Sequence, residues 1–312
     1  MILAGRTCPP DYGLPKELFE AAPCEHCNTL FVAGGLYGNL QAMEALMVLA
    51  QKEKDSVVVM NGDIHWFDKT EQDFQKVEEV AQRYLPLIGN VEAELRREDD
   101  IGVGCGCAYP DCVSQDTVER SNIIHKELKQ SISSRTEWKT LLAERASVAI
   151  IEVGKQKVAI THGDEQSLGG WQCSKESLSD PRRKTELARW MQHREIDVLA
   201  TTHTCEPVAL AWEHGAIINN GAAGMPNFQG DLFGLVTRIS LSPNEEAIYR
   251  GKVGELFVEA LPLRYDHGAF LKWFDHLWPF GSPAAISYRE RIIEGPEMKI
   301  KDAILGRFSI CK

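Results

Sequence analysis

The sequence lacks several features that would assign a protein to a restricted class. It contains no run of 18 apolar residues, so no segment is long enough to cross a membrane as a helix. Its first residues, MILAGRTCPPDYG, lack a basic start followed by an apolar core, so we expect no secretory signal peptide. No internal repeat and no low-complexity segment is visible. We therefore expect a cytoplasmic protein with no membrane partner.

Positive charge is also in short supply. The chain has 34 Lys and Arg against 45 Asp and Glu, giving a formal net charge of -11. Such a balance disfavours a nucleic-acid backbone as the main partner. An anionic phosphate would have to be held locally, by a metal ion or by a few arginines such as Arg182 and Arg183. A length of 312 residues with 44% hydrophobic residues suits one large core, or two domains at most.

Nine cysteines are present, an odd number that favours free thiols in a reducing compartment over a disulfide framework. Two groups stand out, and their members are Cys24 and Cys27 in the first, and Cys105, Cys107 and Cys112 in the second. A structural zinc shared by both groups is one interpretation, because thiolate pairs suit tetrahedral metal. The C-x-C spacing is not that of a usual zinc knuckle, so we favour free thiols. A redox or metal-sensing role that also uses Cys205 is a further alternative.

The hydrophobic pattern predicts alternating strands and helices. Continuous apolar runs at 29–33 and 56–60 are typical of strands buried on both faces. Asn39 can cap a helix whose apolar residues share one face, and a second helix is expected at about 181–194. The segment SVAIIEVGKQKVAITHGD predicts a hairpin that turns at Gly154-Lys155.

These patterns divide the chain into three parts. We expect an N-terminal arm (1–28), a core (29–243) and a C-terminal extension packed on the core (244–312). Residues 92–146 are polar and helical in pattern, and they are expected to form an insertion over one end of the sheet.

Four strand ends carry polar side chains where an apolar run stops. They occur in VVVMNGD, LPLIGN, VAITHGD and VLATTHTC, and their polar residues are Asp63, Asn90, His162 and His203. Because the carboxyl ends of strands on one sheet edge converge, these side chains could meet at one point. One carboxylate, one amide oxygen and two imidazoles suit a divalent ion such as zinc, manganese or iron.

The order Gly-Asp, Gly-Asn, His-Gly and Thr-His-Thr, with this rhythm of strands and helices, resembles the calcineurin-like metallophosphoesterase superfamily. The resemblance covers roughly residues 29–240. The sequence looks like an uncharacterised divergent branch, marked by GDIHWFD, GNVEAE, GCGCAYP and NNGAAGMPNF. The resemblance implies an α/β fold, a four-layer α/β/β/α sandwich with two metal ions at the sheet edge, here with a helical insertion and a C-terminal extension.

The resemblance also assigns metal ligands. It makes Asp63 the bridging carboxylate and completes one ion's ligand set with Asn90, His162 and His203. The Asp-x-His motif of the other ion is missing, because Gly35 and Tyr37 stand at its positions in FVAGGLYGN. The second histidine of the last motif is replaced by Cys205. We therefore expect one divalent ion (Mn, Zn or Fe) rather than two.

Other residues are candidates for the remaining roles. Tyr37 and Cys205 are either ligands of an unusual second ion or fillers of the space that it would occupy. Val91 replaces the histidine that the family uses to protonate the leaving group, so His65 is a candidate proton donor. Glu92 is kept from the family's motif and is the second candidate catalytic residue.

Two functions are compatible with this sequence. The first is hydrolysis of a phosphoester, mono- or diester, by metal-activated hydroxide acting on a small phosphorylated substrate. The second is a catalytically inactive descendant that keeps the fold and binds a ligand or partner. No substrate-binding residue and no oligomeric state can be derived from the sequence.

Overall fold

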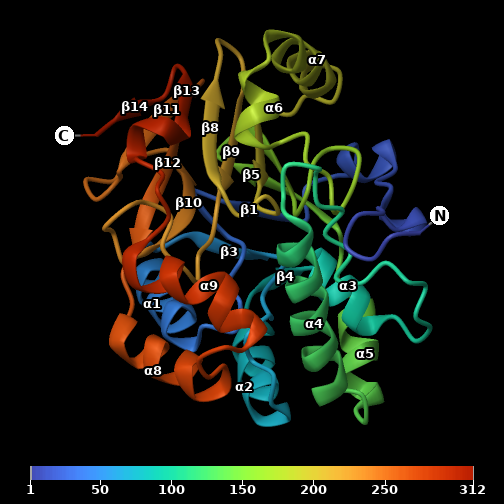
Figure 1. The fold of residues 1–312 in the computed structure, drawn as a ribbon. Coiled ribbons are helices and arrows are strands. Elements are labelled where there is room, and N and C mark those ends of the chain that lie inside the picture. Colours follow the sequence, from blue (N-terminus) through green and yellow to red (C-terminus); the bar gives the residue numbers. More distant parts are fainter. Residues whose placement is uncertain (1, 312) are drawn as a thin grey trace.

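The computed structural model describes residues 2–311, which form two seven-stranded sheets (Figure 1). The first sheet has, in spatial order, β1 (Glu25–Cys27), β5 (Val148–Val153), β6 (Gln156–Thr161), β7 (Val198–Thr201), β9 (Ala216–Asn220), β8 (Pro207–Ala211) and β13 (Ile304–Gly306). The second has β14 (Ser309–Ile310), β11 (Tyr249–Val253), β12 (Leu256–Leu263), β10 (Gly234–Ser240), β2 (Thr29–Ala33), β3 (Ser56–Asn61) and β4 (Leu85–Leu87).

Helices cover the outer faces of both sheets and one end of the molecule (Figure 1). Their bounds are α1 (Leu40–Gln51), α2 (Glu71–Ala81), α3 (Asn90–Arg96), α4 (Gln115–Ser131), α5 (Thr136–Ala143), α6 (Lys175–Ser179), α7 (Pro181–Gln192), α8 (His267–Leu277) and α9 (Pro283–Glu294). Short 3-10 helices lie at Pro10–Tyr12, Lys16–Phe19 and Ile300–Ala303. In the part of the chain that is described, no helix combines the length and the apolar character needed to cross a membrane.

Three apolar layers hold the sandwich together. Side chains such as Val32 and Ile160 fill the space between the two sheets. Phe31 and Met60 point to the other face of the second sheet and pack against α1 and α2. The outer face of the first sheet packs against α6 and α7. Each central strand is thus buried on both faces, as its continuous apolar run predicts, and the predicted α/β/β/α sandwich is confirmed.

Local signals agree with the elements that form. The side chain of Asn39 accepts a hydrogen bond from the backbone N–H of Ala42 (3.0 Å) and caps α1. The hairpin predicted around Gly154 is formed by β5 and β6. The helix expected at about 181–194 is α7, which begins with a proline at its first turn.

The parts of the chain outside the expected core join the sheets. Residues 25–27 of the expected arm form β1, which pairs with β5. Residues 244–312 supply β11, β12 and β14 to the second sheet and β13 to the first, so this segment completes the sandwich besides covering it with α8 and α9. The 92–146 segment contributes most of α3 and all of α4 and α5. Among the C-terminal aromatic residues, Trp278 is buried, whereas Phe280 is fully exposed.

Strand direction places the polar strand ends together. β2, β3 and β4 are parallel to one another, and so are β6, β7 and β9. Parallel strands end at the same sheet edge, which is where α/β folds place their binding sites. The loops that follow β3, β4, β6 and β7 therefore meet at one end of the sandwich.

Candidate metal centre

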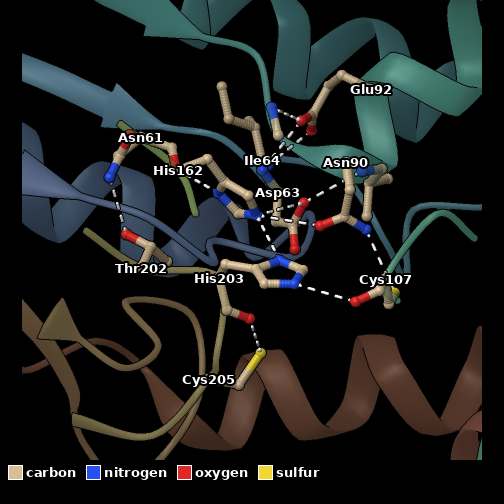
Figure 2. Close-up of polar contacts among 12 residues, drawn as sticks. Asn61, Asp63, Ile64, Asn90, Glu92, Cys107, His162, Thr202, His203 and Cys205 are labelled. Carbon is tan, nitrogen blue, oxygen red and sulfur yellow. Dashed lines mark hydrogen bonds and ion pairs between the residues drawn. The ribbon is translucent and has the colours of Figure 1, made fainter. Parts of the chain in front are cut away.

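Asp63, Asn90, His162 and His203 meet at this edge, each directly after a strand or its closing loop (Figure 2). His162 Nε2 lies 3.1 Å from Asn90 Oδ1, 3.2 Å from His203 Nδ1 and 3.3 Å from Asp63 Oδ1. The ligand atoms of Asp63, His162 and His203 all lie within 4.8 Å of one another. All four side chains are buried.

The outer nitrogens of both histidines are held by backbone carbonyls. Nδ1 of His162 lies 2.8 Å from the carbonyl oxygen of Asn61, and Nε2 of His203 lies 3.2 Å from that of Cys107. A carbonyl can only accept, so the outer nitrogen of each ring carries the proton and donates. The inner nitrogens are Nε2 of His162 and Nδ1 of His203. In the neutral rings each of them bears a lone pair that faces the other ring. This is the arrangement that orients metal-binding histidines in proteins.

The other two side chains also turn acceptors inward. Asn90 Nδ2 donates to the carbonyl oxygen of Cys105 (3.0 Å), which fixes Asn90 Oδ1 toward His162. Asp63 Oδ1 accepts one backbone bond, from Val91 N (3.2 Å). The centre therefore gathers two imidazole nitrogens, an amide oxygen and a carboxylate oxygen with no fixed donor between them. This set of ligand atoms fits one divalent ion of the zinc, manganese or iron type.

The pKa values of the two histidines reflect this crowding of acceptors. Burial lowers the pKa of His162, but the carboxylate of Asp63 outweighs it and raises this pKa above its ordinary value. Burial and the neighbouring His162 lower the pKa of His203 to about 4. The carboxylate of Asp63 thus favours positive charge next to His162.

Glu92 lies behind the centre and holds its loops together. Its two carboxylate oxygens accept backbone N–H groups from four residues: Gly89 (2.9 Å), Asp63 (2.9 Å), Ile64 (2.8 Å) and His65 (3.2 Å). The contact with the Gly89 N–H is the glutamate half of a capping box at the start of α3. These bonds use both oxygens of the carboxylate, so its geometry is that of a residue that positions Asp63.

The backbone is strained at three strand tips around the centre. Tyr37, Asp63 and Cys205 have φ values of 56°, 49° and 55°. These left-handed conformations are uncommon for residues other than glycine and are often found at functional sites. Each of the three follows a different strand, so the strain is concentrated where the loops converge.

Side chains fill the space at the loop that follows β2, which we call the first strand tip. The hydroxyl of Tyr37 lies 2.7 Å from Cys205 Sγ, and its ring packs 6.1 Å from that of Phe67. A Cβ atom added to Gly35 would lie 2.7 Å from the Tyr37 hydroxyl oxygen and 2.8 Å from Cζ. Burial raises the pKa of both Tyr37 and Cys205, so phenol and thiol stay neutral. The Tyr37 ring thus occupies the space that a side chain at position 35 would need.

His65 points away from the four ligands. Its Nδ1 lies 2.5 Å from Asp68 Oδ2, its Nε2 lies 2.6 Å from Glu78 Oε1, and its ring stacks on Phe74. Burial opposes its charge, but the two carboxylates raise the pKa of His65 to about 9. Arg145 also donates to Glu78 (2.5 Å), which completes a buried ionic network. With both ring nitrogens engaged, His65 has none to offer to a substrate.

Glu78 makes the stability of this network dependent on pH. Burial opposes ionisation, but hydrogen bonds from His65 and charge from Arg145 lower the pKa of Glu78 to about 2 from 4.5. The carboxylate therefore stabilises the fold above pH 4.5, and this contribution is lost as the pH falls toward 2.

We expect Glu78→Gln to lower the free energy of unfolding by about 3 kcal/mol at neutral pH, because two cationic groups lose their partner. Urea unfolding across this pH range measures both effects.

The control is Glu79→Gln, the next residue on α2, whose side chain is exposed. It should follow the wild type at every pH. The Glu78→Gln variant should lose less stability than the wild type between pH 4.5 and pH 2. Parallel curves for Glu78→Gln and the wild type over that range would contradict the assignment.

Cysteines and arginines outside the centre have other partners. Cys24 precedes β1 and Cys27 is its last residue. Cys105 and Cys107 lie beside Asn90, and the sulfur atoms of these two cysteines are 2.8 Å apart. Among residues 2–311, clusters of His, Cys, Asp and Glu close enough to share an ion are limited to the one containing Asp63. The guanidinium of Arg183 is paired with Glu165 (2.6 and 2.8 Å) and is not available to a phosphate at the centre.

Several residues of the site were not identified from the sequence. The carbonyls of Asn61 and Cys107 orient the histidines, and a backbone carbonyl leaves no residue-type signal. Aromatic residues close the cavity beside the ligands, and they are Trp66, Tyr109, Trp171 and Tyr288. Trp66 stands in the motif GDIHWFD, which was a usable signal; the other aromatic residues come from distant segments.

Comparison with known proteins supports the fold. No protein-family model matches the sequence, and no curated protein does. The metallophosphoesterase from Sphaerobacter thermophilus superposes with a TM-score of 0.53 at 15% identity, over 86% of this chain and 100% of its own. The hypothetical protein PH1004 from Pyrococcus horikoshii OT3 superposes with a TM-score of 0.59 at 12% identity, over 86% and 99%. This chain therefore has the fold of a metallophosphoesterase, with its cluster of potential metal ligands at the expected sheet edge.

Proposed function

We propose that this protein hydrolyses a phosphoester with the help of one divalent ion held by Asp63, Asn90, His162 and His203. The observation that carries the proposal is the convergence of four acceptor atoms, two of them lone pairs turned inward by hydrogen bonds to Asn61 and Cys107. When bound, a divalent ion polarises a phosphoryl oxygen and lowers the pKa of a coordinated water toward about 7. The protein's part is to orient the four ligands beside a largely apolar cavity.

A single ion is favoured by the first strand tip. Tyr37 and Cys205 contact each other and are neutral, and Gly35 has no side chain. A second ion would have to displace the phenol ring and then rely on Asp63 as its anionic ligand. These residues support a filled pocket beside a one-ion centre.

Metal content tests the proposal directly. We expect purified protein loaded with Mn²⁺ to bind one ion per chain and to hydrolyse members of a panel of small phosphomonoesters and phosphodiesters. Elemental analysis gives the stoichiometry, and release of phosphate or alcohol gives the activity. Bound metal without hydrolysis of any panel member would contradict the enzymatic proposal, and absence of metal affinity would contradict the centre itself.

The valine at position 91 predicts how the rate of hydrolysis depends on the leaving group. Its apolar side chain lines the cavity, and the ring nitrogen of His203 that bears a proton already donates to Cys107. Among the described lining residues, no histidine therefore has a free N–H with which to protonate the leaving oxygen. We expect 4-nitrophenyl esters to react roughly a hundredfold faster than phenyl esters, because general acid catalysis of that size is missing. Steady-state rates for the two esters measure this ratio.

Val91→His provides the matched variant. A histidine at this position restores a proton donor of the kind that the family resemblance implies. The variant should raise the rate for the phenyl ester more than for the 4-nitrophenyl ester, so that the ratio falls. An unchanged ratio in Val91→His, or equal rates for both esters in the wild type, would show that another group protonates the leaving oxygen.

A second candidate function is binding without catalysis. The filled first strand tip and Val91 favour it, because both remove parts of a two-ion catalyst. This candidate predicts that a phosphate ester binds to the metal-loaded protein but is recovered intact.

A further inference from the structure

The cavity beside the four ligands is small and walled by aromatic rings. Its volume is about 220 Å³, and its floor includes Asp63, Asn90 and His203. The rings belong to Trp66 after β3, Tyr109 in the 92–146 segment, Trp171 after β6 and Tyr288 on α9. Tyr109 and Trp171 lie 6.0 Å apart, and Trp171 meets His203 edge to face at 5.3 Å. Such walls favour a flat apolar group next to the phosphorus.

The charge of the cavity is nearly neutral without an ion. Within the described part of the chain, Asp63 is its one acidic lining residue, and no lysine or arginine lines it. Arg291 lies behind Cys205, where its guanidinium donates to the carbonyls of Pro226 (2.9 Å) and Cys205 (3.1 Å). A divalent ion with one carboxylate gives a net charge of plus one, or of zero once a coordinated water is ionised. In both cases a phosphate with one negative charge leaves less uncompensated charge in this apolar space than a phosphate with two.

Trp66, one of the residues of this wall, has a donor without a partner. The residue is 3% exposed and lines the cavity. Its indole Nε1 is buried and has no hydrogen-bond partner. A buried N–H without an acceptor is unfavourable and rare in folded proteins. An oxygen of a bound ester would provide the acceptor that the protein itself does not, once a small shift of the Trp66 ring exposes this N–H to the cavity.

We propose that the substrate of this centre is a phosphodiester with a single negative charge and at least one aromatic ring, bound with an ester oxygen accepting from Trp66 Nε1. The ring is either an aryl ester or a nucleobase, since both offer the same flat face. This inference rests on the proposed function. Hydrolysis of such a diester adds one water: its oxygen bonds to phosphorus, one P–O ester bond breaks, and the departing oxygen takes a proton from that water. The product monoester carries two charges and fits the cavity less well.

Binding measurements test the inference separately from the rate of turnover. Isothermal titration of the Mn²⁺-loaded protein at pH 8, above the second phosphate pKa of about 6, compares three probes. Diphenyl phosphate should bind about tenfold more tightly than phenyl phosphate, which has a second charge, and than dimethyl phosphate, which has no ring. Thymidine 3′,5′-cyclic phosphate tests the nucleobase source. Equal or tighter binding of phenyl phosphate would overturn the inference, and so would equal binding of dimethyl phosphate.

Two matched tryptophan variants test the donor. Trp66→Phe keeps a ring but removes the N–H, and it should weaken diphenyl phosphate binding about tenfold while the affinity for Mn²⁺ is unchanged. Trp190→Phe, on α7 against Phe19, is the same substitution outside the cavity and should change neither value. Unchanged diphenyl phosphate affinity in Trp66→Phe would remove Trp66 from the proposal.

Turnover separates this inference from the proposed function. Bis(4-nitrophenyl) phosphate should release one 4-nitrophenol per molecule and should react faster than 4-nitrophenyl phosphate. If only the monoester reacts, the substrate class is wrong while phosphoester hydrolysis stands. If neither reacts but diphenyl phosphate is still preferred in titration, hydrolysis is wrong while the recognition of aromatic diesters stands.

Discussion

Replacement of Asp63 by asparagine is expected to lower the affinity for a divalent ion by about a hundredfold or more. Mutation of a residue that only hydrogen-bonds to a metal ligand already lowers metal affinity by about 10–100-fold. Asp63 is the one anionic member of the cluster, and the other three ligands are neutral when an ion is bound. The substitution preserves the size of the side chain and one oxygen. Titration with Mn²⁺ measures the affinity, and any phosphoester hydrolysis should fall with it.

Asp55→Asn is the matched control for this variant. Asp55 lies just before β3 and Asp63 just after it, so both substitutions remove one charge next to the same strand. Asp55 is exposed and accepts from the backbone N–H of Asn28 at 3.1 Å, so its loss should leave metal affinity unchanged. Equal Mn²⁺ affinity in Asp63→Asn and Asp55→Asn would mean that the cluster is not the metal centre.

The meeting of Asp63, Asn90, His162 and His203 could be predicted because each signal is local. A buried parallel strand gives a continuous apolar run, and the residue after it faces the sheet edge. Val57–Met60 and Val158–Ile160 are such runs, and each is followed by one of the ligands within three residues. Once the strands are known to be parallel, convergence of their ends follows from sheet geometry.

The roles of His65 and Glu92 could not be derived in the same way. The chain turns at Asp63 with a φ of 49°, and this turn sends His65 toward α2 instead of the cavity. Nothing in the spacing between Asp63 and His65 specifies that direction. For Glu92 a partial signal did exist: a glutamate three residues after Gly89 fits the glutamate half of a capping box, in which its carboxylate accepts the backbone N–H of the N-cap residue.

The aromatic wall required the tertiary structure. Trp66, Tyr109, Trp171 and Tyr288 come from four segments that share no periodicity, and each could equally be a core residue. The same limit applies to β13 and β14, which are short and join opposite sheets. Their pairing depends on partners far away in the sequence. The aromatic wall is therefore set by contacts between segments, whereas the four candidate ligands are set by single strand ends.

Glu92→Gln is expected to destabilise the protein by about 3 kcal/mol and to weaken metal binding at the same time. The carboxylate accepts N–H groups of Gly89, Asp63, Ile64 and His65, and hydrogen bonds to a charged acceptor are the stronger ones. An amide offers one oxygen, and its NH₂ group would face two of these donors. The loop that carries Asp63 would lose its anchor to the start of α3. Urea unfolding and Mn²⁺ titration measure the two effects.

The control for Glu92→Gln lies on the same helix. Glu94 is also buried, but its carboxylate accepts from side chains, those of Tyr12 (3.0 Å) and Arg97 (2.9 Å), and not from the loop that carries Asp63. Glu94→Gln should reduce stability while Mn²⁺ affinity stays close to that of the wild type. A catalytic Glu92 would give a different pattern: Glu92→Gln would keep both stability and metal affinity and lose turnover alone. Because the positioning role requires stability and metal affinity to fall together, the pair of variants decides between the two roles without knowledge of the natural substrate.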